Sequence, residues 1–114
     1  MDQIRLLVNE SLLLGAETLE AHMAVYPVDS FYQRHRDTFA EDDSRVLSTV
    51  FYLNDNWLKE DGGTLKLYLK DKEVEILPEA GTLICFFSQI VEHEVLPTQR
   101  ERHSIAGWFK KRPI

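Results

Sequence analysis

The stretch TLEAHMAVYP, residues 18–27, decides the fold class because its side chains change character at every second position. A period of two residues is typical of a β-strand with one buried face and one solvated face. Pro27 closes the strand. The strand carries two sets of side chains, Leu19, Ala21, Met23 and Val25 on one face and Glu20, His22, Ala24 and Tyr26 on the other.

Seven further segments favour strands because they are short and rich in β-branched and aromatic residues. Turn-forming Gly, Pro, Asn and Asp separate them in NDN, EDGG, KDK, PEAG and PTQ. Short strands at regular intervals are typical of a sandwich, a barrel or a jelly roll. The segments are FYQRHRDTF (31–39), RVLSTVFYLN (45–54), GTLKLYL (63–69), EVEIL (73–77), TLICFF (82–87), VEHEVL (91–96) and RHSIAGWFK (102–110).

The N-terminal residues predict one short amphipathic helix over residues 2–14, and Gly15 is a natural helix end. We interpret residues 1–15 as the remnant of a longer helical support and residues 16–114 as the β domain. A sheet face that lacks its support would favour a homodimer or lower stability. The apolar residues that fit the helix are Ile4, Leu7, Val8, Leu12 and Leu14.

Composition excludes several classes of partner. The chain has 114 residues and a formal net charge of −6, and an acidic protein lacks the basic face that nucleic acid or an anionic membrane requires. The run LLVNESLLLG is too short and too polar to span a membrane, so the default location is the cytoplasm. The single cysteine, Cys85, lies in the apolar run TLICFFS, which favours core packing over a catalytic nucleophile.

A histidine and a carboxylate in FYQRHRDTF suggest a metal site. On a strand, His35 and Asp37 point to the same face, roughly 6 to 7 Å apart, so both can reach one ion. His93 is the best third ligand, because a jelly roll brings its late strands back beside its early ones. Two histidines and one carboxylate form the facial triad of non-haem Fe(II) oxygenases. The alternative for the pair alone is a surface charge or a hydrogen-bonded histidine.

An arginine on the last predicted strand adds a second element. Arg102 lies nine positions after His93, and the alternation of the strand places it on one face with Ser104, Ala106 and Trp108. A buried arginine needs an anion. Arg100 lies on the same face and competes for this role.

These segments together resemble the Fe(II)- and 2-oxoglutarate-dependent dioxygenase superfamily, in its prolyl-4-hydroxylase-like branch. That branch includes bacterial and hypoxia-inducible-factor prolyl hydroxylases. The resemblance implies a double-stranded β-helix, which is a jelly roll. The matching segments are YPVDSFYQRHRDTF, SRVLSTVFYLNDNW, EDGGTLKLYL, LPEAGTLICFFS and HEVLPTQRERHSIAGWF.

The resemblance also implies roles for individual residues. His35, Asp37 and His93 would bind the iron, and Arg102, rather than Arg100, would pair with the distal carboxylate of 2-oxoglutarate through its bidentate fork. Tyr52 and Tyr26 would lie in the cosubstrate pocket; the alternative for both is a tyrosine that only packs in the core. Arg45 and Trp108 would lie at the substrate entrance. The alternative for Arg45 is a surface charge, and the alternative for Trp108 is core packing.

The activity that the resemblance implies is hydroxylation of a C–H bond, favouring a prolyl residue in a protein, with release of succinate and CO₂. Fe(II) would be the cofactor, 2-oxoglutarate and O₂ the cosubstrates, and ascorbate a reductant. Free amino acids or other small molecules are alternative substrates, because fold and metal site are shared across many hydroxylases. A non-catalytic metal-binding jelly roll, or a truncated inactive relative, is the alternative of a different class.

Overall fold

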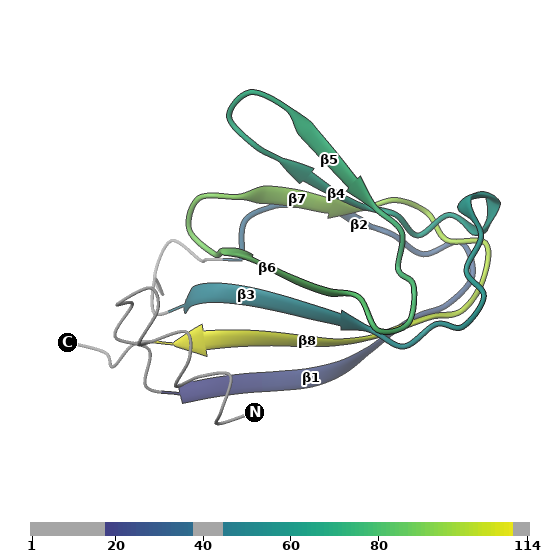
Figure 1. The fold of residues 1–114 in the computed structure, drawn as a ribbon, viewed down its shortest axis with the longest axis horizontal. Helices are drawn as coiled ribbons and strands as arrows, with labels where there is room; N and C mark the ends of the chain where they lie inside the picture. The colour runs from purple at the N-terminus through teal and green to yellow at the C-terminus, as the bar shows by residue number, and fades with distance from the viewer. Residues whose placement is uncertain (1–17, 38–44, 111–114) are drawn as a thin grey trace.

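The computed structural model describes residues 18–37 and 45–110, which form two four-stranded antiparallel sheets that face each other (Figure 1). This arrangement is a jelly roll, or double-stranded β-helix. The long-stranded sheet, in the order β1-β8-β3-β6, contains β1 (Thr18–Tyr26), β8 (Arg102–Lys110), β3 (Arg45–Tyr52) and β6 (Leu83–Phe87). The short-stranded sheet, in the order β2-β7-β4-β5, contains β2 (Tyr32–His35), β7 (Glu92–Val95), β4 (Leu65–Tyr68) and β5 (Glu73–Ile76). A 3₁₀ turn, η1, covers Lys59–Asp61.

Each of the eight predicted strands is present, and the prediction of a jelly roll is confirmed. Alternation in residues 18–27, and β-branched and aromatic residues between turns in the other segments, therefore located the strands correctly. The helix predicted over residues 2–14 lies outside the described residues, as do residues 38 and 39 of the predicted strand 31–39. Arg36 and Asp37, which that prediction placed in the strand, lie past the end of β2. Within the part of the chain that the structure describes, no helix is long and apolar enough to cross a membrane.

The core lies between the two sheets and follows from the alternation of the strands. On β4, Leu65 and Leu67 are buried while the side chains between them are half-buried. Inward-facing side chains of both sheets meet in one apolar cluster, which fixes the distance between the sheets. The buried members of this cluster are Tyr52, Leu65, Leu67, Phe86, Val91 and Val95.

The outer face of the long-stranded sheet is apolar and contains Cys85, so the prediction that Cys85 packs in the core is wrong. β6 buries Phe86 but exposes Leu83, Cys85 and Phe87, so the continuous apolar run does not mark a strand buried on both faces. Partial desolvation raises the pKa of the Cys85 thiol, the opposite of the shift that activates a nucleophile. The strand register places an apolar row across this face, which consists of Met23, Ile105, Phe51 and Leu83.

We predict that Gly107→Ala lowers the free energy of unfolding by about 1 to 3 kcal/mol, the usual range for overpacking. A Cβ atom at this position would lie 2.8 Å from the Thr49 hydroxyl oxygen on the neighbouring strand. Urea denaturation measures the change. The matched control is the same substitution in a Thr49→Ala background, which removes the clash. Equal losses in both backgrounds would contradict this explanation.

Candidate functional site

Strand pairing brings the three predicted metal ligands together. His35 ends β2 and lies opposite His93 of β7, and Asp37 follows His35 by two residues. The Asp37 Oδ1 atom lies 3.3 Å from His35 Nε2 and 3.1 Å from His93 Nε2. The ligand atoms of all three residues lie within 4.8 Å of one another. One ion could therefore contact all three from one side, as a facial triad requires.

The outer nitrogens of both histidines fit a metal site. His35 Nδ1 lies 2.6 Å from the carbonyl oxygen of Gln33, and His93 Nδ1 lies 3.3 Å from that of Val91. A carbonyl oxygen only accepts, so each Nδ1 carries a hydrogen, and Nε2 is the nitrogen that faces Asp37 and could bind a metal ion. Such contacts fix the ring orientation of metal-binding histidines. The site therefore presents two nitrogen ligands and one carboxylate oxygen, a donor set that suits Fe(II).

The second oxygen of Asp37 is held by a tryptophan. The Trp108 indole Nε1–H donates to Asp37 Oδ2 at 3.0 Å. Arg45 donates to the Asp37 backbone carbonyl at 2.9 Å, and its guanidinium lies 4.0 Å from the centre of the Trp108 ring. With Oδ2 engaged, Oδ1 is the oxygen that faces both histidines. Trp108 and Arg45 thus act on the orientation of a predicted metal ligand.

A buried arginine, Arg102, is the second feature of the site. Arg102 is 2% exposed and donates through Nε to the Gly63 carbonyl at 2.8 Å and through Nη2 to the Tyr52 hydroxyl at 3.0 Å. Its guanidinium lies 5.0 Å from the Tyr26 ring centre and 4.9 Å from that of Tyr52. Among the described residues, no carboxylate lies within ion-pair distance of Arg102. A buried cation with only neutral partners favours an anionic ligand.

One cavity of about 350 Å³ connects the triad with Arg102. Both the triad and Arg102 line it, together with Tyr52 and Tyr26. On β8, the short side chains of Ser104 and Ala106 lie between Arg102 and Trp108, so the space between the arginine and the triad stays open. The volume suits a small molecule. A ligand with a chelating end and a distal carboxylate would fit this distribution of charge.

Residues 21–110 match the family model of the 2OG-Fe(II) oxygenase superfamily, where 2OG is 2-oxoglutarate. The chain belongs to this superfamily. It is 37% identical over 94 residues to a hypoxia-inducible factor prolyl hydroxylase of Caenorhabditis elegans, which covers 78% of this chain and 13% of that protein. The family assignment agrees with the triad and the cavity.

Two solved structures resemble this 2OG-Fe(II) oxygenase. A prolyl-4-hydroxylase of Pseudomonas putida superimposes with a TM-score of 0.94 at 50% identity, covering 98% of this chain and 62% of that one. A Trichoplax adhaerens prolyl hydroxylase, in complex with a peptide fragment of the hypoxia inducible factor oxygen degradation domain, superimposes with a TM-score of 0.78 at 33% identity. That match covers 84% of this chain and 46% of the other. The chain thus spans less than two thirds of the length of each of these three relatives.

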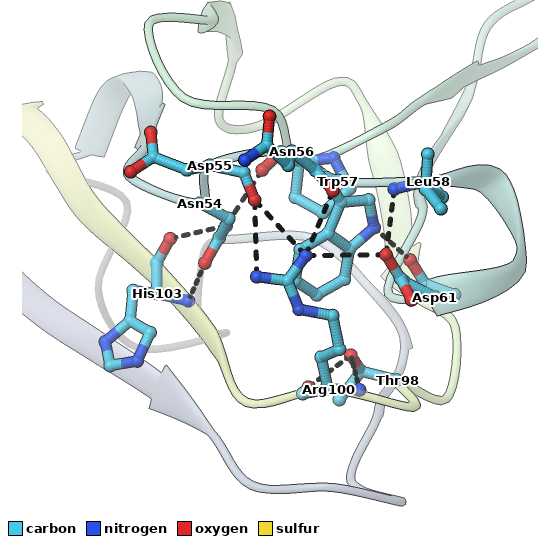
Figure 2. Close-up of polar contacts among 11 residues, drawn as sticks. Asn54, Asp55, Asn56, Trp57, Leu58, Asp61, Thr98, Arg100 and His103 are labelled. Atoms are coloured by element: carbon cyan, nitrogen blue, oxygen red, sulfur yellow. Dashed lines mark hydrogen bonds and ion pairs between the residues drawn. The ribbon is translucent and has the colours of Figure 1, made fainter.

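Arg100, the rival of Arg102, lies outside the cavity of this oxygenase. Its guanidinium contacts the backbone carbonyls of Asp55 and Asn56 and the carboxylate of Asp61, and it stacks on the Trp57 ring (Figure 2). Arg45 and Trp108, the two residues predicted at the entrance, line the cavity. His22 and His103, which match no ligand position, pair on the surface with Glu20 and Glu101.

Burial and hydrogen bonds set the charge of the site residues. Burial opposes protonation of His35, but its bonds to Asp37 and to the Gln33 carbonyl outweigh burial and raise its pKa. Burial alone would raise the pKa of Asp37, yet hydrogen bonds from both histidines hold it well below its usual range. Burial raises the pKa of Tyr52 to about 12 against the opposing charge of Arg102. Tyr52 therefore keeps its hydroxyl hydrogen at neutral pH.

Sequence reasoning missed two residues that shape this site. The Gly63 carbonyl holds Arg102, and a Cβ at Gly63 would lie 2.9 Å from Arg102 Cδ. The Ser48 hydroxyl bonds to the Ser88 hydroxyl at 2.8 Å and also contributes to the low pKa of Asp37. The GG pair of the EDGG turn marked a reversal of the chain. No pattern in the sequence shows which carbonyl faces a guanidinium.

We predict that Trp108→Phe weakens metal binding about tenfold, the lower end of the range for contacts that orient metal ligands. The substitution keeps an aromatic ring but removes the hydrogen bond to Asp37 Oδ2. Competition titration with Mn(II) measures the affinity. The matched control is Trp57→Phe, which removes an indole hydrogen bond to the Gly62 carbonyl and touches no metal ligand. Equal affinity of Trp108→Phe and the parent protein would refute the role of the indole.

We also predict that chelator-treated protein is less stable at about pH 8 than at about pH 6. The pKa of His35 is above its ordinary value of 6.5 in the folded state, so protonation stabilises the fold below that value. The stabilisation is lost as the pH rises through the folded-state pKa. Urea denaturation at the two pH values tests this, and His35→Gln should remove the difference.

Saturating Mn(II) should reverse this pH dependence, because a histidine ligand must be neutral to bind a metal ion and protons compete with the ion. His103→Gln, on the surface, is the control that should behave like the parent protein. A pH dependence that persists unchanged in His35→Gln would show that another group causes it.

Proposed function

We propose that this chain binds Fe(II) through His35, Asp37 and His93 and 2-oxoglutarate through Arg102 and Tyr52, and that it hydroxylates a prolyl residue in a protein. The observation that carries the proposal is the buried Arg102, which has no carboxylate partner among the described residues and shares a cavity with a metal triad. Membership of the 2OG-Fe(II) oxygenase superfamily supports it.

The two residues around the distal carboxylate have complementary tasks. Arg102 uses Nε and Nη2 for Gly63 and Tyr52, and its Nη1 makes no hydrogen bond within the described part of the chain. Arg102 can therefore donate to an anion from the cavity side. Tyr52 accepts from Arg102, so its own hydrogen is available for the same carboxylate. The Tyr52 pKa of about 12 keeps that donor present.

When bound, Fe(II) and 2-oxoglutarate supply the oxidation of a C–H bond by O₂, with release of succinate and CO₂. The chain's own residues hold and orient these reactants. The Trp108 hydrogen bond to Asp37 Oδ2 leaves Oδ1 for the metal. Val50, Leu65 and Val95 line the cavity with apolar groups, which limit water near the metal. Ascorbate would serve as a reductant.

A protein substrate is favoured by the chemistry of two side chains that line the cavity. Arg45 and Trp108 offer a cation stacked on an aromatic ring beside the metal ligands, a combination that suits a peptide. The Trichoplax relative is in complex with a peptide fragment, which also supports a peptide substrate for this chain. The prolyl specificity rests on the relatives named above. The cytoplasmic location and the homodimer stay predictions.

We extend the proposal to the division of the chain. Residues 1–15, with their amphipathic pattern, would support the apolar outer face of the long-stranded sheet, while residues 16–114 would form the oxygenase domain. The exposed apolar row of that face is the observation that supports this division.

Anaerobic addition of Fe(II) and 2-oxoglutarate to the metal-free protein tests the site. We expect a weak visible charge-transfer band that His35→Ala abolishes and Arg102→Ala weakens, because the first removes a ligand and the second the partner of the distal carboxylate. Absence of the band in a folded protein would favour the alternative, a metal-binding jelly roll without this activity.

Mass spectrometry tests the substrate. Incubation with candidate proteins should add the mass of one oxygen atom to a proline, and free amino acids under the same conditions should not change. Oxygen added only to free amino acids would replace the prolyl assignment by a small-molecule hydroxylase.

A further inference from the structure

Asn54, just beyond the end of β3, is buried, and its side-chain amide makes three hydrogen bonds (Figure 2). Its Oδ1 accepts from the backbone N–H of His103 at 2.7 Å. Its Nδ2 donates to the carbonyl of His103 at 2.9 Å and to that of Pro78 at 2.8 Å. A carboxamide offers the same donor and acceptor as a peptide group. The side chain therefore replaces backbone pairing where the β3–β8 ladder ends.

The position of this contact matters because it adjoins both residues of the proposed carboxylate site. Asn54 follows Tyr52 by two residues, and its partner His103 directly follows Arg102. The last paired residues of the ladder are Tyr52 and Ser104. Beyond them, the backbone of β3 contributes one long bond, from the Leu53 N–H to the His103 carbonyl at 3.3 Å. The hydrogen bonds of the Asn54 amide to the His103 backbone are thus shorter than the backbone bond that joins the same two segments next to Arg102.

The neighbouring contacts of Arg100 are a weaker candidate for the same role. The Arg100 side chain is 41% exposed, and the bonds of its guanidinium to Asp55, Asn56 and Asp61 measure 3.2 to 3.4 Å. Long contacts of an exposed side chain fix a position poorly. Asn54 is 4% exposed, and its three bonds measure 2.7 to 2.9 Å. The short, buried contacts of Asn54 therefore fix the position of the backbone from which the Arg102 side chain extends.

We propose that Asn54 is a positioning residue for 2-oxoglutarate. Its amide holds the backbone next to Arg102 so that the guanidinium and the Tyr52 hydroxyl, 3.0 Å apart, meet one carboxylate. This inference rests on the proposed function. Its consequence is selective: a ligand that reaches from the metal to Arg102 depends on Asn54. A ligand that contacts only the metal does not.

The test compares two 2-oxo acids on the full chain under anaerobic conditions. Fe(II)-loaded protein is titrated with 2-oxoglutarate, and separately with pyruvate, which has the same chelating end but no distal carboxylate. The charge-transfer band reports binding of each. For Asn54→Ala we expect the Kd of 2-oxoglutarate to rise about tenfold, the order expected for a lost buried hydrogen bond. The Kd of pyruvate should stay within about twofold of the parent value, because no contact with pyruvate is lost.

Three further variants make the result specific. Asn54→Asp keeps the acceptor for the His103 N–H but loses both donated bonds, so it should show the same selective loss, and it decides the question if Asn54→Ala does not fold. Val74→Ala, on the edge strand β5, is a destabilised control that should bind both acids normally. Arg102→Ala should lose 2-oxoglutarate selectively, which establishes that the assay detects the distal carboxylate.

The outcomes separate this inference from the proposed function. No band for the parent protein with 2-oxoglutarate would overturn the proposed function itself. A normal Kd of 2-oxoglutarate in the Asn54 variants, with a selective loss in Arg102→Ala, would overturn only the role of Asn54. A similar rise in the Kd of both acids would also overturn the role of Asn54, because the loss of a merely structural residue lowers both affinities together.

Discussion

The structure of this oxygenase depends on a positive charge that is buried between two sheets without a negative partner among the described residues. Arg102 has a carbonyl, a hydroxyl and two aromatic rings around it. Neutral groups reduce the penalty of burying a guanidinium but do not balance its charge. A carboxylate ligand would supply that balance. Cosubstrate binding and the stability of the charged core are therefore linked through one side chain.

The metal end is organised by a different constraint, the pairing of β2 with β7. Placing His35 opposite His93 brings two rings from distant parts of the chain to a centroid distance of 4.3 Å. Asp37 then reaches both rings from just past the end of β2. A slip of one residue in this pairing would turn one ring to the other face of the sheet. Strand register is thus a condition for the triad.

The fold was predictable from the sequence because strand periodicity is a local property. Alternation located the strand of residues 18–27, and β-branched and aromatic residues between turns located the other seven. Contrary to the prediction from their spacing, His35 and Asp37 do not share a strand, because β2 ends at His35. The prediction for Cys85 was wrong because an apolar run has the same appearance whether one or both faces of the strand are buried. Only the sheet order shows that Cys85 lies on the outer face.

The supporting residues of the site could not be predicted for a related reason. Gly63 acts through its backbone carbonyl and Asn54 through an amide that pairs with a strand far along the chain. Gly and Asn are common in turns, so their local pattern indicates a reversal of the chain and nothing more. Their roles depend on contacts between segments that are distant in sequence.

The strand β8 contributes two side chains to the cavity, Arg102 and Trp108, and Trp108 lies next to the proposed metal ligand Asp37. An extended strand cannot be compressed, since its rise per residue is fixed at about 3.3 Å. The backbone of β8 therefore sets the distance between Arg102 and Trp108, and the hydrogen bond of Trp108 to Asp37 links that distance to the position of the triad. A shorter or longer dicarboxylate would be rejected by geometry rather than by charge, and the cavity would select its cosubstrate by length.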